Sequence, residues 1–143
     1  MRTLTSIVAS VAAFLLIALS YIHVYWAFGG RWGGAAAVPI KPGGEALFRP
    51  RTTETIAVAV LLLIACVSLL IQAGIARFMD ANSYIRVICV LCAAVFFLRA
   101  IGEFKYLGFF KRVKNTKFAV NDTKYYSPLC LFLSLAYLVA LIE

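Results

Sequence analysis

The chain has 143 residues, of which 64% are hydrophobic and only 14% are charged. Together with a mean hydropathy of +0.94, this composition excludes an ordinary soluble globular domain. A membrane-spanning helix needs about 20 mostly apolar residues, so the length accommodates four such helices and no separate soluble domain. We therefore predict an all-α fold, an integral membrane four-helix transmembrane bundle that forms a single domain over residues 1–143.

The net charge of +8 comes from 14 Lys and Arg residues against 6 Asp and Glu residues. In a membrane protein, basic residues gather in cytoplasmic loops and attract anionic lipid headgroups. Outside the apolar runs there is no basic stripe with interleaved aromatic residues, so no nucleic acid partner is expected. The expected partners are membrane lipids, and beyond them a hydrophobic small molecule or another membrane protein.

The first predicted helix covers residues 4–28, an uncharged run near the N-terminus. A signal peptide is the alternative, since Arg2 precedes the run and Ala18-Leu19-Ser20 resembles a cleavage site. The apolar part of a signal peptide has only about 7–15 residues, whereas this run continues past that site, which favours a spanning helix. The only histidine, His23, lies near the end of the run. Counting back from it at intervals of three or four residues gives a narrow stripe suited to close helix packing: Ser20, Leu16, Ala13, Ala12 and Ala9.

The long connection that follows begins with the glycine-rich stretch 29–34 and extends to about residue 53. It is neither rich in serine nor acidic, as flexible linkers are, and it contains prolines and the aromatic residues Trp32 and Phe48. Long loops in compact proteins are usually functional or disordered. We predict a structured cap whose aromatic residues return to the bundle or the headgroups, with a flexible linker as the alternative.

The second predicted helix covers residues 54–76, with Thr52 or Thr53 as its N-cap and Glu54 in the first turn, where the helix dipole favours an anion. Its polar and small residues recur at intervals of four and three, which predicts an inward face. That face consists of Glu54, Val58, Leu61, Ala65, Ser68 and Gln72.

The third predicted helix covers residues 84–106 and carries Arg99 and Glu103 four residues apart, on one face. Its inward stripe is Cys89, Cys92, Phe96, Arg99, Glu103 and Tyr106. The fourth covers residues 126–142, with Pro128 tolerated in the first turn, and its inward stripe is Ser127, Cys130, Ser134 and Tyr137.

The distribution of basic residues predicts the orientation in the membrane. With four spans, the two long connections share one side and hold ten Lys and Arg residues, whereas the other side holds only Arg2, Arg77 and Arg86. Because basic residues stay on the cytoplasmic side, we predict a multi-pass protein of the inner (plasma) membrane with both termini outside and the long loops in the cytoplasm.

Several stretches together resemble a bacterial family of domains of unknown function, number 3995, over essentially the whole chain. They are His23-Val-Tyr-Trp-Ala-Phe-Gly-Gly30, Ala37-Val-Pro39, Arg99-Ala-Ile-Gly-Glu-Phe-Lys-Tyr-Leu-Gly-Phe-Phe-Lys111, Phe118-Ala-Val-Asn-Asp122 and Tyr126-Ser-Pro-Leu-Cys130. The resemblance implies a bacterial multi-pass membrane protein. It implies no particular chemistry.

Ionisable residues within a membrane are costly and indicate function by default. We predict that residues from three helices and the third connection form a polar pocket in the cytoplasmic half of the bundle, which binds a lipid, an amphiphile or a partner segment. Arg99, at its centre, would hold an anionic group and contact Glu103 and at least one of Glu54 and His23. The predicted ligand-binding residues are His23, Tyr25, Trp26, Glu54, Arg99, Glu103, Tyr106 and Asp122.

Four alternatives stay open at this stage. Arg99 and Glu103 could be a structural ion pair, or the arginine could extend to the headgroups. The protein could be a membrane-embedded acid–base enzyme that uses His23 and a carboxylate on a lipid-like substrate, or an accessory subunit of a larger membrane complex. Cys89 and Cys92 have the C-x-x-C spacing of redox enzymes, but their apolar surroundings favour packed thiols. With one histidine and no ligand spacing around it, we expect no metal and no cofactor.

Overall fold

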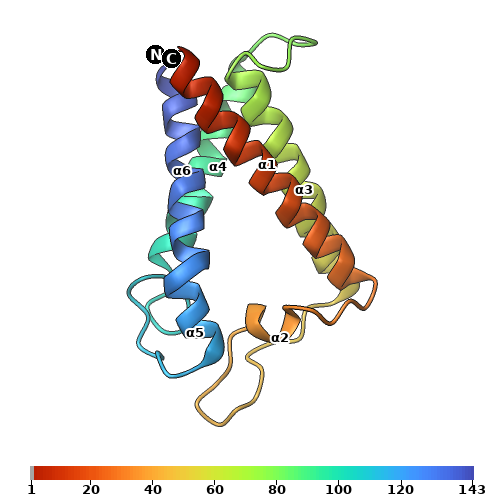
Figure 1. Ribbon diagram of the computed structural model, residues 1–143, viewed down its shortest axis with the longest axis vertical. Coiled ribbons are helices and arrows are strands. Elements are labelled where there is room, and N and C mark those ends of the chain that lie inside the picture. The colour runs from red at the N-terminus through yellow and green to blue at the C-terminus, as the bar shows by residue number, and fades with distance from the viewer. Residues whose placement is uncertain (1) are drawn as a thin grey trace.

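The computed structural model describes residues 2–143 and is built from four long helices (Figure 1). These are α1 (Arg2–Ala27), α3 (Thr52–Gln72), α4 (Ser83–Ile101) and α6 (Ser127–Ile142). The last is continuous with α5 (Lys117–Asn121) and the π-helical turn η1 (Asp122–Tyr126), whereas the short α2 (Gly34–Ala37) lies in the first long connection. All four spans are long and apolar enough to cross a membrane, when α5, η1 and α6 are taken together. The predicted all-α four-helix membrane bundle is confirmed.

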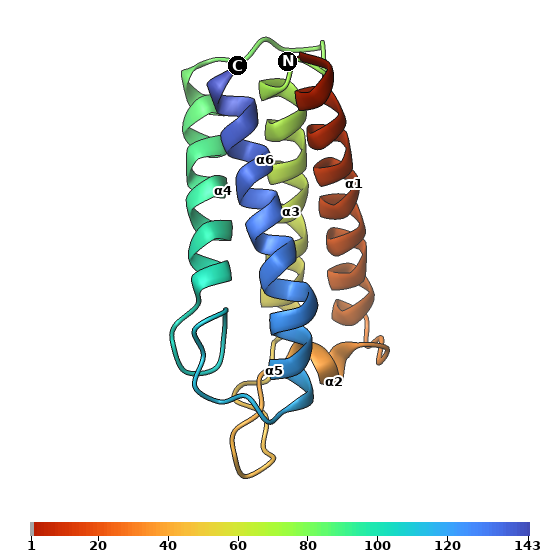
Figure 2. The ribbon, with the colours of Figure 1, turned by 60° about the vertical axis from the view of Figure 1, so that its left-hand side comes forward.

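The four helices associate mainly as two pairs. α1 packs chiefly against α3, and α4 packs chiefly against α6. The pairs lie together at the upper end, where both termini are found, and diverge toward the lower end, where both long connections lie (Figures 1 and 2). The lower ends of the two pairs therefore lie apart (Figure 1), which decides where the polar residues come together.

Small residues form most of the core. α1 buries Ala9, Ala12, Ala13, Leu16 and Ser20, which confirms the stripe predicted from the sequence. Residues of this size let helix backbones approach closely, and in lipid, close packing replaces the hydrophobic effect as the force between helices.

Short polar side chains connect the helices through backbone carbonyl groups. The Ser20 hydroxyl of α1 donates to the Ala59 carbonyl of α3 at 2.8 Å. On α6, Ser134 donates to the Ala93 carbonyl at 2.8 Å, and Tyr137 donates to the Ala65 carbonyl at 2.6 Å. Buried polar groups in lipid need such partners, and so the inward positions predicted for Ser134 and Tyr137 are confirmed.

The inward face predicted for the second helix is only partly correct. Ala65 and Ser68 are buried, whereas Val58 and Leu61 are 41% and 63% exposed. The buried face is different because α3 packs mainly on α1. It consists of Ala59, Ala65, Cys66, Ser68, Leu69 and Ile71. Its inward direction is thus set by one neighbouring helix and not by the centre of the bundle.

Two helices end earlier than predicted, each at a glycine with positive φ. α3 ends at Gln72, before Gly74 with φ of 67°, and α4 ends at Ile101, before Gly102 with φ of 81°. Glycine adopts this backbone conformation without the steric cost that other residues incur, so it commonly stops helices. The predicted ends at residues 76 and 106 are therefore wrong, and Glu103 and Tyr106 do not lie on α4.

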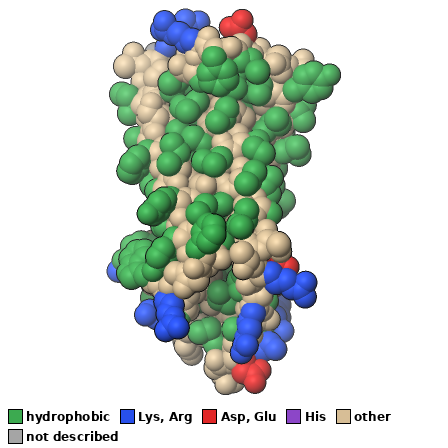
Figure 3. Space-filling model, turned by 90° about the vertical axis from the view of Figure 1, so that its right-hand side faces the viewer, with side chains coloured by type: hydrophobic (Ala, Val, Ile, Leu, Met, Phe, Trp, Pro, Cys, Tyr) green, Lys and Arg blue, Asp and Glu red, His purple; other side chains and the backbone are tan. Residues whose placement is uncertain are grey.

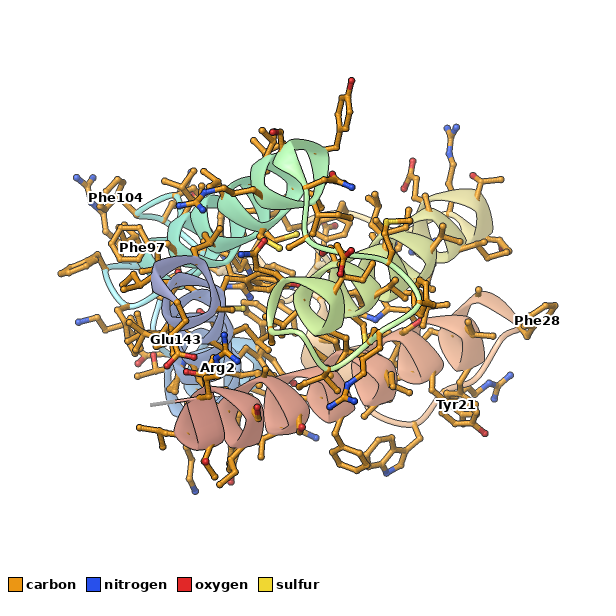
Figure 4. All side chains as sticks on the ribbon, turned by 90° about the horizontal axis from the view of Figure 1, so that it is seen from above. Arg2, Tyr21, Phe28, Phe97, Phe104 and Glu143 are labelled. Carbon is orange, nitrogen blue, oxygen red and sulfur yellow. The ribbon has the colours of Figure 1, made fainter. Side chains whose placement is uncertain are left out.

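The outer surface fits a lipid environment. Hydrophobic side chains cover the middle of the molecule, and basic side chains gather at the lower end around the long connections (Figure 3). Seen from above, the aromatic residues Tyr21, Phe28 and Phe97 point away from the bundle (Figure 4), and they are 74%, 81% and 47% exposed. This surface and the four apolar helices identify a multi-pass membrane protein.

Candidate functional site

A partly open cavity of about 410 Å³ lies at the lower end of the α1–α3 pair, where the first long connection covers it. His23 and Trp26 of α1 and Glu54 of α3 line it, so three of the predicted binding residues meet there. The rest of the lining comes from the long connection and from α3. It includes Phe48, which was predicted to return to the bundle, and Val58, which was predicted to face inward. Sequence reasoning missed the others: Gly30, Gly34, Ala37, Val38, Pro50 and Thr55. Ligand pockets in proteins commonly have volumes of about 300–1,000 Å³ and mostly apolar walls with a few polar groups, which describes this cavity.

The long connection is folded over the cavity and is not a flexible linker. The Trp26 indole nitrogen donates to the Trp32 carbonyl at 2.8 Å, which fixes the start of the connection to α1. Further along, Ile40 and Ala46 form an isolated antiparallel bridge. The Tyr126 hydroxyl donates to the Ala36 carbonyl at 3.1 Å, so α2 is also tied to η1. The predicted structured cap is confirmed.

Tyr25 lies beside the cavity without lining it. Its ring packs so closely on Gly30 that a Cβ atom at that glycine would lie 2.2 Å from the ring. A side chain at residue 30 would therefore require the Tyr25 ring to move. Phe48 returns to the cavity as predicted, whereas the Trp32 side chain is 74% exposed.

Hydrogen bonds around the cavity fix the orientation of its polar groups. His23 Nδ1 lies 2.7 Å from the Leu19 carbonyl oxygen, which can only accept, so Nδ1 carries a proton; in the neutral tautomer of the ring, Nε2 is then an acceptor. The ring also makes an edge contact with Trp26, with centroids 5.2 Å apart. One Glu54 carboxylate oxygen accepts the Arg51 backbone N–H at 3.2 Å and so caps α3, while Arg51, and not Thr52 or Thr53, occupies the N-cap position.

Arg99 belongs to a different site, at the lower end of the α4–α6 pair. It donates through Nη2 to Asp122 Oδ1 at 2.8 Å, and Lys111 Nζ donates to Asp122 Oδ2 at 3.0 Å. The Asp122 side chain is fully buried and the Lys111 side chain is 1% exposed. Asp122 also accepts the Gly108 backbone N–H at 2.8 Å. We call Arg99, Lys111 and Asp122 the ion cluster.

The ion cluster depends on the chain reversal that ends α4. Gly102 and Gly108 come so close that a Cβ atom on Gly102 would lie 1.9 Å from the Leu107 carbonyl oxygen, and one on Gly108 would lie 2.1 Å from the Ile101 carbonyl oxygen. Phe109 N then donates to the Ala100 carbonyl at 2.9 Å. Two glycines at this crossing return the chain to the helix end, and this brings Lys111 to Asp122.

The predicted contact between Arg99 and Glu103 is wrong, as is the single pocket that would unite Arg99 with Glu54 or His23. Glu103 is exposed, and its carboxylate accepts the Tyr106 backbone N–H within the loop. Within residues 2–143, the ion pairs are those of the ion cluster. Arg99 does lie in a polar cluster and does not simply extend to the headgroups, but its partner is Asp122.

Sequence reasoning missed Lys111 and Gly108 as members of this cluster. The signal available for finding them was Gly102, because a glycine after an apolar helical run often marks the helix end. A helix that stops there leaves Glu103 off the face of Arg99 and makes the following loop the source of its partner.

The cysteines make no disulfide; all four are free thiols. Cys89 is fully buried, and its thiol lies 3.5 Å from the Ser68 carbonyl oxygen. Within residues 2–143, no three His, Cys, Asp or Glu side chains come together in a group suited to a metal ion.

These observations define the class of protein as a multi-pass four-helix membrane bundle with a folded cap over one helix pair. The chain belongs to the protein family of unknown function DUF3995, whose family model matches residues 16–137. The matched range includes both the cavity and the ion cluster, and the resemblance seen in the sequence is confirmed. Comparison with curated proteins and with solved structures gave no match.

Proposed function

We propose that this protein binds an amphiphile or a lipid in the cavity between α1, α3 and the cap. The observation that carries this proposal is the cavity itself: about 410 Å³, with mostly apolar walls and with His23 and Glu54 as polar groups. A space of this size holds roughly a dozen groups of the volume of a water molecule, at about 30 Å³ each. A single alkyl chain is a suitable occupant.

The proposed location is the inner (plasma) membrane of a bacterium, with both termini outside and the cap in the cytoplasm. It is supported by the excess of basic residues in the two long connections. In this orientation, the cavity lies toward the cytoplasmic interface, where a headgroup can stay hydrated while its chain enters the cavity.

Blocking the cavity tests the proposal. Val58 lines it and is 41% exposed, so Val58→Trp is expected to fill the space without disturbing the core. Val60, on the same helix and 49% exposed, does not line the cavity and supplies the matched control Val60→Trp. Native mass spectrometry of protein released from lipid nanodiscs should show a retained lipid or amphiphile in the wild type and Val60→Trp but not in Val58→Trp. Equal retention by all three proteins would contradict the proposal.

An acid–base enzyme acting on a lipid-like substrate is the second candidate, since the acceptor nitrogen of His23 and the Glu54 carboxylate line one cavity. If the protein is such an enzyme, the mass of the amphiphile bound to the wild type should change over time. The amphiphile bound to folded His23→Ala should keep its mass. An amphiphile that stays chemically intact in the wild type would count against this candidate.

A further inference from the structure

The polar side chains that line the cavity use their donors within the protein and keep acceptors free. Three side-chain donors around the cavity are already committed to backbone carbonyl groups of the protein. Trp26 Nε1 donates to Trp32, His23 Nδ1 donates to Leu19, and the Thr55 hydroxyl donates to Arg51 at 2.9 Å. Each of these groups has therefore used its proton.

What remains free on the same side chains accepts hydrogen bonds. Nε2 has a lone pair in the neutral His23 ring, the Thr55 oxygen has lone pairs, and Glu54 has a second carboxylate oxygen beyond the one that caps α3. Glu54 takes part in neither of the two ion pairs found within residues 2–143. No Lys or Arg side chain of the described residues therefore forms an ion pair with Glu54, and Glu54 is the one acidic or basic side chain that lines the cavity.

The first long connection carries four basic residues, Arg31, Lys41, Arg49 and Arg51, but none of them lines the cavity. Arg99, which the sequence analysis associated with a bound anionic group, is paired with Asp122 on the other helix pair, and so is Lys111. Neither lines the cavity. A carboxylate or phosphate placed against Glu54 would meet a like charge, whereas an ammonium group there would meet an opposite charge and could donate to a charged acceptor.

We infer that the ligand of this cavity is a cationic amphiphile, an alkyl chain that carries a protonated amine. This inference rests on the proposed function and specifies its ligand class. The alkyl chain lies against the apolar wall formed by residues such as Val38, Phe48 and Val58, and the ammonium group donates to Glu54 and His23 at the cavity mouth. The exposed position of Glu54 agrees with a headgroup held at the edge of the cavity.

The test compares three probes of equal chain length: dodecylamine, dodecanoate and dodecanol. The titrations are made at a pH of about 8.5, where the amine is protonated and the carboxylic acid is ionised although contact with lipid raises the pKa of the acid. The full-length protein in phosphatidylcholine nanodiscs is titrated with each probe, and bound probe is counted by native mass spectrometry. Binding to Val58→Trp is subtracted because it measures partition into the lipid. Since attraction of the amine and repulsion of the carboxylate add, the wild type should bind dodecylamine about tenfold more tightly than dodecanoate, even with solvent screening at the exposed Glu54.

Glu54→Gln should reduce this preference to about twofold or less, because the glutamine oxygen preserves the cap on α3 but carries no charge. Glu45→Gln is the matched control and should keep the preference, because Glu45 is an exposed acidic residue of the first long connection that does not line the cavity. In the wild type itself, added salt should weaken the preference, which gives a test that needs no variant.

The outcomes separate this inference from the proposed function. If all three probes bind equally and Val58→Trp abolishes their binding, the cavity is a binding site but the ligand class is wrong. Tighter binding of dodecanoate, or a preference that survives in Glu54→Gln, likewise overturns the inference. If no probe binds the wild type better than it binds Val58→Trp, the proposed function fails, and the inference fails with it.

Discussion

Replacing Asp122 by asparagine should destabilise the fold more than any other change of one acidic residue in this chain. The Asp122 carboxylate is fully buried and accepts from Arg99, Lys111 and Gly108 at 2.8–3.0 Å. Asparagine has nearly the same shape, so Asp122→Asn removes the charge with little change in packing. The positive charge of Lys111 then stays buried without a counter-ion.

The magnitude follows from the burial of the two cations. Removing one partner of a buried ion pair typically costs about 3–5 kcal/mol. Lys111, whose side chain is 1% exposed, is subject to this full penalty, whereas Arg99 is 30% exposed and can be hydrated in part. We therefore expect the free energy of unfolding to fall by about 3 kcal/mol, the lower end of that range.

Reversible unfolding in mixed detergent micelles, followed by circular dichroism, measures this change. Asp80→Asn is the matched control, because Asp80 is exposed in the short connection between α3 and α4 and forms none of the ion pairs. The double variant Lys111→Met/Asp122→Asn should be less destabilised than the sum of the two single variants, since it leaves no lysine charge stranded.

The reasoning is refuted if the free energies of unfolding of Asp122→Asn and Asp80→Asn differ by less than about 1 kcal/mol, because burying an unpaired charge costs more than that. It is also refuted if the double variant shows the full sum of the single losses. Glu103→Gln should behave like the control, because Glu103 is exposed. A large loss in Glu103→Gln would support the Arg99–Glu103 pair that the sequence suggests.

Two further predictions concern the orientation and the thiols. A single cysteine introduced at Lys114 into a cysteine-free background should be protected from a membrane-impermeant thiol reagent in intact cells, and one at Glu143 should be labelled; the reverse pattern would invert the proposed orientation. Replacing Cys89 and Cys92 together by alanine should lower the free energy of unfolding by about 1 kcal/mol or less per site, because little volume is lost. Thermal unfolding measures that cost, and a reversible Cys89–Cys92 disulfide found in the native protein would contradict the interpretation as packed thiols.

The four spans and their small inward residues could be predicted because they depend on local properties. Preference for lipid over water is set by the side chains of about 20 consecutive residues. The stripe from Ala9 to Ser20 repeats with the period of a helix, so its residues share a face whatever the neighbours are. The cavity residues His23 and Glu54 could be placed near the same membrane face by counting along the spans, and the structure brings them into one cavity.

The partner of Arg99 could not be obtained in this way. The spacing of Arg99 and Glu103 implies a shared face only if the helix continues, and α4 ends between them, before Gly102. The actual partner, Asp122, is 23 residues away in sequence. It comes close because two glycines cross and turn the loop back onto the helix.

The separation of the cavity from the ion cluster was likewise decided only by the tertiary structure. Residue spacing gives the depth of a side chain along its own helix, and both sites lie at the same end of the bundle. It does not say which helices pair, and here α1 pairs with α3, and α4 with α6. Packing between small residues joins the helices in this way, and the pairs diverge toward the lower end (Figure 1). Arg99 therefore pairs with Asp122 at the α4–α6 pair, while His23 and Glu54 line a cavity at the α1–α3 pair.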